Sequence, residues 1–133
     1  MLEKLEGSRV SEVFVSSDTE TMFLVTDKGI YRLDLDGDCC SETWFSDIYN
    51  FDALIGTIGT IQEIDLPDYD VDDGRTRQCE DCAYGIEVVT DKGVSKIVFR
   101  NSSNGYYGGN LNQVAKVSSL PDGLTKITED WKA

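Results

Sequence analysis

The sequence predicts an α+β fold in a single domain, with a mainly antiparallel β-sheet built from two hairpins, plus one main helix. A chain of 133 residues fits one domain with one hydrophobic core. The segment Val25–Ile30 (VTDKGI) recurs as Val89–Val94 (VTDKGV), and residues typical of strands flank both copies. An apolar stripe at helical spacing lies between the two copies. These three observations predict the hairpins and the helix.

The first part of the chain is predicted to form a short lead-in and three strands. Met1–Gly7 is expected to be extended or to form one turn. Val10–Val15 is rich in β-branched and aromatic residues, which favour a strand. Thr21–Thr26 and Ile30–Leu35 form the first hairpin, because apolar and charged residues alternate in the second of them. Gly29, at the end of the short connection, predicts a type I turn closed by a glycine bulge.

The main helix is predicted over Thr43–Ile55. Its apolar stripe consists of Trp44, Ile48, Phe51 and Ile55. Asn50 is a candidate cap for a second, shorter turn within this region, and Gly56 is a plausible stop signal.

The second half of the chain contains further strand patterns around an acidic segment. Ile58–Leu66 alternates in the manner of a strand, and Leu111–Val117 is expected to form another one. Residues 67–82 are rich in aspartate and lack hydrophobic periodicity, which predicts an exposed acidic loop. Ser119–Gly123 has turn composition, and the pattern of the C-terminal tail, residues 118–133, leaves both a strand and a frayed helix open.

The charge balance excludes several classes of partner. The net charge is −13, from 12 basic and 25 acidic residues, which argues against non-specific binding to nucleic acid or to an anionic membrane. The sequence shows no apolar run of membrane-spanning length and no signal peptide, so we expect a cytoplasmic protein. The same charge would also suit a protein that imitates nucleic acid.

Catalysis and metal binding are not expected. The chain contains no histidine, so it lacks the commonest general base and the commonest metal ligand. The adjacent Cys39 and Cys40, with the pair Cys79 and Cys82, could in principle form a zinc site. Neighbouring side chains on a strand point to opposite faces, and carboxylates around the second pair would raise the thiol pKa. We therefore expect reduced, packing cysteines, no cofactor, no metal and no enzymatic activity.

The segment Arg100–Gly109 (RNSSNGYYGG) contains the strongest candidate ligand-binding residues. It follows the strand pattern Ser95–Phe99 and combines an arginine, short polar side chains, glycines and two tyrosines. Arginine offers a planar fork for phosphate, tyrosine a stacking face, and asparagine and serine both donors and acceptors. The alternative is a glycine-rich turn whose tyrosines pack on the edge of the core. If both hairpins join one sheet, this segment emerges beside the polar segment Asp36–Ser41.

Two motifs in the chain resemble those of a family of small phage and prophage proteins. They are Gly37–Trp44 (GDCCSETW) and Arg100–Gly109, accompanied by Leu54-Ile55 and by Tyr84-Gly85. The resemblance runs from Val10 to Leu111, and the family is identified as including the Thoeris anti-defence proteins of the sponge type. Such proteins capture a cyclic ADP-ribose signal without cleaving it. They form dimers that can build into hexamers.

The resemblance implies a binding site for a cyclic nucleotide and a homo-oligomeric protein. Arg100 would face phosphate, and Asn101, Ser102, Ser103 and Asn104 would bond phosphate or ribose. Tyr106, Tyr107 or Trp44 would stack on the base. Because the chain is acidic, we expect Arg100 to need a basic neighbour, either Arg75 or Arg77.

A second hypothesis belongs to a different class of function. An acidic phage protein could inhibit a DNA-binding defence complex of the host by occupying its basic groove. Charge reversal in Asp68–Asp81 would abolish that activity and spare a nucleotide trap, whereas Arg100→Ala or Tyr106→Ala would do the reverse.

Overall fold

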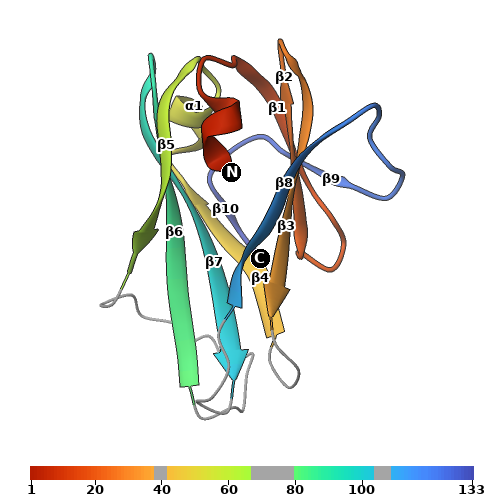
Figure 1. Cartoon of the computed structure of the whole chain (residues 1–133), viewed down its shortest axis with the longest axis vertical. Helices are drawn as coiled ribbons and strands as arrows, with labels where there is room; N and C mark the ends of the chain where they lie inside the picture. The colour runs from red at the N-terminus through yellow and green to blue at the C-terminus, as the bar shows by residue number, and fades with distance from the viewer. Residues whose placement is uncertain (38–41, 67–79, 104–108) are drawn as a thin grey trace.

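The protein is a sandwich of two antiparallel β-sheets that face one another (Figure 1). The computed structural model describes residues 1–37, 42–66, 80–103 and 109–133. Each sheet has five strands in this part of the chain. The predicted antiparallel character is therefore confirmed, whereas the helical content is limited to one short α-helix and one 3₁₀ turn among the described residues.

Consecutive strands are grouped within one sheet, and the chain crosses to the other sheet only between such groups. The first sheet has the order β8-β3-β2-β1-β9 and consists of β1 (Val10–Val15), β2 (Thr21–Thr26), β3 (Gly29–Gly37), β8 (Gly109–Val117) and β9 (Thr125–Ile127). The second has the order β10-β4-β7-β6-β5 and consists of β4 (Glu42–Tyr49), β5 (Ile58–Asp65), β6 (Glu80–Thr90), β7 (Gly93–Ser103) and β10 (Trp131–Lys132). The helical elements are η1 (Leu2–Leu5) and α1 (Phe51–Leu54).

Both predicted hairpins are present, as β2–β3 and β6–β7. Thr26 pairs with Gly29 and Thr90 pairs with Gly93, so each connection is a two-residue loop. Both glycines have a positive φ, near 134°, which explains why glycine occupies this position. The register of each hairpin continues without a shift, so the predicted glycine bulge is wrong. The premise that the hairpins share one sheet is also wrong, because they lie in opposite sheets.

The predicted helix over Thr43–Ile55 is mostly a strand. Thr43–Tyr49 belongs to β4, and only Phe51–Leu54 is helical. A bulge between Phe45 and Asp47 shifts the register of β4 against β7, so Phe45 and Ile48 both reach the core although they are three residues apart. Apolar spacing of three residues is typical of a helix, and here a bulged strand produces it.

The structure also changes the limits of two predicted loops and decides between the two conformations left open for the tail. Arg100–Ser103 continue β7 instead of forming a turn, and Glu80–Cys82 begin β6 instead of ending the acidic loop. The tail contributes one short strand to each sheet, β9 and β10. Residues 67–79, which make up most of the acidic segment, lie outside the described residues.

The core lies between the sheets and is closed at one end by η1 and α1 (Figure 1, top). Leu5 of η1 is fully buried, and the Nζ atom of Lys4 donates to the carbonyl oxygen of Val114 on the edge strand β8. At the opposite end, β3, β4, β6, β7 and β8 meet (Figure 1, bottom). None of the described helices is long and apolar enough to cross a membrane.

Candidate functional site

The residues that flank the two polar segments of the sequence lie together at the lower end of the sandwich. Gly37, at the end of β3, pairs with Gly109, at the start of β8. Glu42, at the start of β4, pairs with Ser102 in β7. The strand ends that flank residues 38–41 and 104–108 therefore lie at one end of the molecule (Figure 1). The expected reason, a single sheet shared by both hairpins, is not the cause, because these strands belong to two sheets.

Arg100 and Trp44 form a contact pair across β7 and β4 at this end. The two residues are register partners, and the Cζ atom of Arg100 lies 5.2 Å from the centre of the Trp44 ring. Their neighbours Phe99 and Phe45 point into the core, so alternation places Arg100 and Trp44 on the outer face of the second sheet. Both side chains are nevertheless almost fully buried, at 3% and 2% exposure. A stacked cation of this kind contributes about 0.5–2 kcal/mol.

Asn101 points to the opposite face of β7 and links two strands. Its Nδ2 atom donates to the carbonyl oxygen of Glu42, at 3.1 Å, and to Oγ1 of Thr43, at 2.9 Å. The side chain is 1% exposed. In this structure the amide group of Asn101 therefore holds β7 against β4, a structural role that the sequence did not reveal.

The remaining predicted ligand residues fall outside what the structure describes. Ser102 and Ser103 are placed as strand residues without their side chains, and Asn104, Tyr106 and Tyr107 are not described. The side chains of Arg75, of Arg77 and of the four cysteines also lie outside the described part of the protein. Among the described residues, no group of three or more cysteine or acidic side chains could hold a metal ion.

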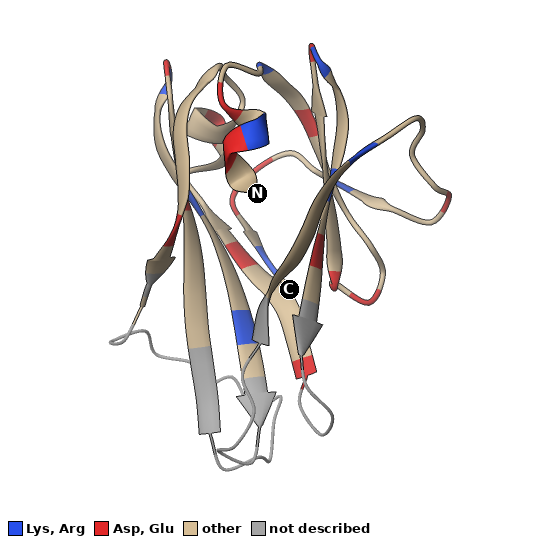
Figure 2. Ribbon diagram, viewed as in Figure 1, with Lys and Arg blue, Asp and Glu red and all other residues tan. Residues whose placement is uncertain are grey.

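Acidic side chains are spread over both sheets and their loops within the described part of the chain (Figure 2). Two of them, in the connection between β1 and β2, have shifted pKa values. The pKa of Asp18 is lowered, because the carboxylate accepts hydrogen bonds from Oγ of Ser16 and from the backbone N–H of Glu20. The pKa of Glu20 is raised by partial burial and by the negative charge of Asp18.

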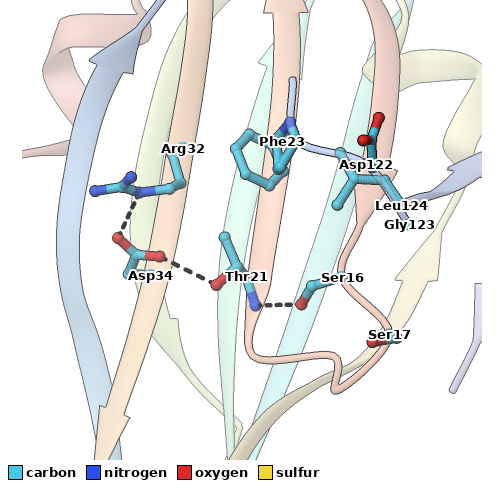
Figure 3. A pocket seen from close by; sticks show the side chains of 10 residues that line it. Ser16, Ser17, Thr21, Phe23, Arg32, Asp34, Asp122, Gly123 and Leu124 are labelled. Carbon is cyan, nitrogen blue, oxygen red and sulfur yellow. Dashed lines mark hydrogen bonds and ion pairs between the residues drawn. The ribbon is translucent and has the colours of Figure 1, made fainter. Parts of the chain in front are cut away.

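A hollow on the outer face of the first sheet was not predicted from the sequence. It has a volume of about 420 Å³ and lies between β3 and the turn at residues 121–124 (Figure 3). Arg32 and Asp34 line one side, and Thr21 and Phe23 line the base. Arg32 and Asp34 are two residues apart on one strand, and Thr21 and Phe23 are two residues apart on the next, so the sequence could have shown that each pair lies on one face of its strand. The sequence does not reveal that the distant turn at residues 121–124 forms the other wall of the hollow.

A comparison with protein families assigns the chain to a group without a known activity. Residues 3–112 match the model of a domain of unknown function, DUF7448. The chain belongs to the DUF7448 family. The match runs from η1 into β8, so β9 and β10 lie beyond the DUF7448 region. No curated protein and no solved structure matches the chain.

Proposed function

We propose that this protein is a phage anti-defence protein that binds a cyclic ADP-ribose type of signal and sequesters it without cleaving it. In this proposal it acts as a homo-oligomer in the cytoplasm of the host cell. The observation that supports the proposal is the arrangement at the lower end of the sandwich. There the flanks of both polar segments converge, and Arg100 stacks on Trp44.

The chemistry of these residues suits a dinucleotide with a pyrophosphate group. The cation of Arg100 is nearly excluded from water, and attraction between charges strengthens when water is excluded. We assign Arg100 and Trp44 to the base of the site. Asn101 was expected to bond phosphate or ribose, but its amide holds β7 against β4 on the opposite face, so we give it a supporting role. The residues that follow them in the chain, Ser102 to Tyr107, supply hydroxyl, amide and aromatic groups. Each base stacked on a tyrosine would add about 1–3 kcal/mol of binding energy.

A thermal shift assay with cyclic ADP-ribose isomers and cyclic oligonucleotides tests the proposal. A ligand present at many times its dissociation constant stabilises the folded state by roughly 2.7–4 kcal/mol. We expect a large shift with one cyclic ADP-ribose isomer and recovery of that ligand intact after heat denaturation. A cleaved product would mean an enzyme, and no shift with any compound would rule out the trap.

Substitution of Tyr106 separates ligand binding from stability. Tyr106→Ala should weaken binding of the responsive nucleotide roughly 5- to 150-fold, the equivalent of about 1–3 kcal/mol, as measured by calorimetry. The control is Tyr49→Ala, because Tyr49 is 44% exposed and lies at the far end of β4.

Arg100→Lys keeps the charge but loses the planar fork, so it should weaken binding as well. Its melting temperature must be measured alongside, because Arg100 is buried. Equal affinity of wild type and Tyr106→Ala would contradict the assigned site.

The second candidate function is an acidic inhibitor of a host DNA-binding complex, which the net charge of −13 favours. Reversal of the charges in Asp68–Asp81 should then abolish inhibition, and inhibition should weaken as salt concentration rises. A nucleotide trap should keep its affinity in the same variant.

A further inference from the structure

We propose that the hollow on the outer face of the first sheet is a second small-molecule site, and that it binds a neutral carbohydrate. Its volume of about 420 Å³ lies within the range of roughly 300–1,000 Å³ that is usual for small-molecule sites. In Figure 3, Arg32 and Asp34 stand on one side, Phe23 and Thr21 lie between, and Asp122, Gly123 and Leu124 stand on the other side.

Hydrogen bonds fix the direction of the Arg32 guanidinium group. Its Nε atom donates to Oδ2 of Asp34 at 2.8 Å, and Oδ1 of Asp34 accepts from Oγ1 of Thr21 at 3.1 Å. Both carboxylate oxygens of Asp34 therefore have protein partners. Within the described residues, the terminal nitrogens of Arg32 make no further hydrogen bond or ion pair, and the side chain is 37% exposed. These nitrogens are preorganised donors at the edge of the hollow.

The connection between β1 and β2 adds hydroxyl groups at the lower rim. Oγ of Ser16 donates to Asp18 at 2.6 Å and accepts from the backbone N–H of Thr21 at 3.1 Å, which fixes the loop against β2. Ser17 also lines the hollow, and its hydroxyl makes no hydrogen bond within the described part of the chain. It is a donor and acceptor that a ligand could use.

The mixture of groups selects the class of ligand. Asp34, Asp122 and the nearby Asp18 make the surroundings acidic, which disfavours an anion such as a phosphate. The positive charge of Arg32 disfavours an amine or another cation at the same place. A neutral ring with several hydroxyl groups can accept from Arg32 and Ser17 and donate to Asp122, while its apolar C–H surface lies against Leu124, because Phe23 at the base is only 4% exposed. A carbohydrate has all of these features.

This site is independent of the proposed nucleotide trap. It lies on the outer face of the first sheet, whereas Arg100 and Trp44 lie on the outer face of the second. A failure of either proposal therefore leaves the other unaffected.

Titration of the ¹⁵N-labelled protein with methyl glucoside, methyl galactoside, ribose and maltose tests the assignment by NMR. We expect at least one of these sugars to shift the amide signals of Thr21, Arg32, Asp34 and Gly123 in a saturable manner. Glucose 6-phosphate serves as the anionic probe. Binding of the phosphate without binding of any neutral sugar would overturn the assignment. Shifts that do not saturate, or that map elsewhere, would do the same.

Arg32→Ala supplies the matched variant. The Arg32–Asp34 pair is partly exposed, so its loss should leave the protein folded, as the NMR spectrum will show directly. We expect at least a tenfold loss of affinity for the sugar that binds wild type. Arg9→Ala removes an exposed arginine from outside the hollow and should bind like wild type. Equal binding by Arg32→Ala and wild type would refute the site.

Discussion

Individual residues of the candidate site combine ligand chemistry with structural roles. The sequence predicts that Asn101 and Arg100 contact a ligand, because amide and guanidinium groups bind nucleotides. The structure shows that the first links β7 to β4 and that the second packs on Trp44. Residue type indicates which groups can bond a ligand, but it does not show whether a neighbouring strand already uses them. That depends on the pairing of Asn101 with Thr43, which are far apart in the sequence.

The role of Asn101 gives a prediction at the residue scale. Asn101→Ala removes two hydrogen bonds and leaves the buried Thr43 hydroxyl without this donor, so it should lower the free energy of unfolding by about 1–3 kcal/mol. Urea denaturation of the ligand-free protein measures the effect. Asn112→Ala, at an exposed position in β8, is the control and should change stability by less than about 0.5 kcal/mol. Equal stability of the two variants would show that the amide is dispensable for the fold.

At the scale of single elements, strands with a clear alternation or β-branched composition were predictable, and the bulged strand was not. The expected strand limits agree with the structure for β1 and β2, and within a few residues for β3, β5 and β8. β4 is buried on both faces from Thr43 to Ile48, so it lacks the alternation that marks a half-exposed strand. Its bulge then creates a spacing that imitates a helix.

The connection between β1 and β2 gives a prediction for pH dependence. Because the pKa of Asp18 is lowered, its carboxylate stabilises the folded state above the ordinary pKa of aspartate, and this contribution disappears as pH falls through the lowered pKa. The raised pKa of Glu20 acts in the opposite sense, since its ionisation as pH rises disfavours the folded state.

NMR titration of the side-chain carboxyl groups should show Asp18 below and Glu20 above their ordinary pKa values. In Asp18→Asn, the pKa of Glu20 should fall toward its ordinary value, because the negative charge of Asp18 that helps to raise it is removed. Part of the increase should remain, because Glu20 is still partly buried. Asp122→Asn should leave Glu20 unchanged, because Asp122 does not contribute to that shift. An unaltered Glu20 in Asp18→Asn would contradict the coupling.

At the scale of the whole molecule, the sequence predicted hairpins but not their distribution between two sheets. Each hairpin is a local feature, and the repeated Thr-Asp-Lys-Gly turn identifies it. The sandwich also depends on pairs distant in sequence, such as β3 with β8 and β1 with β9. Short strands such as Thr125–Ile127 have little pattern of their own, and their conformation follows from the edge that they join.

The C-terminal tail connects the two sheets, although it lies beyond the part of the chain that matches the family. β9 pairs with β1 in the first sheet, and β10 pairs with β4 in the second. Between these strands, Oδ1 of Asp130 accepts from the backbone N–H of Phe51 at the start of α1, at 2.7 Å. The tail therefore covers one edge strand of each sheet and supports α1.

Deletion of residues 119–133 should consequently destabilise the protein and promote association. The loss of buried Ile127 alone should cost about 2–5 kcal/mol, and the newly exposed edges of β1 and β4 would offer unpaired backbone groups to other molecules. Thermal denaturation and light scattering at several concentrations measure both effects. Lys126→Ala, which breaks only an exposed ion pair with Glu12, should change stability by less than about 1 kcal/mol. If the truncated chain melts like wild type and stays in its native oligomeric state, the strands up to β8 form a complete fold, and the tail must serve another purpose.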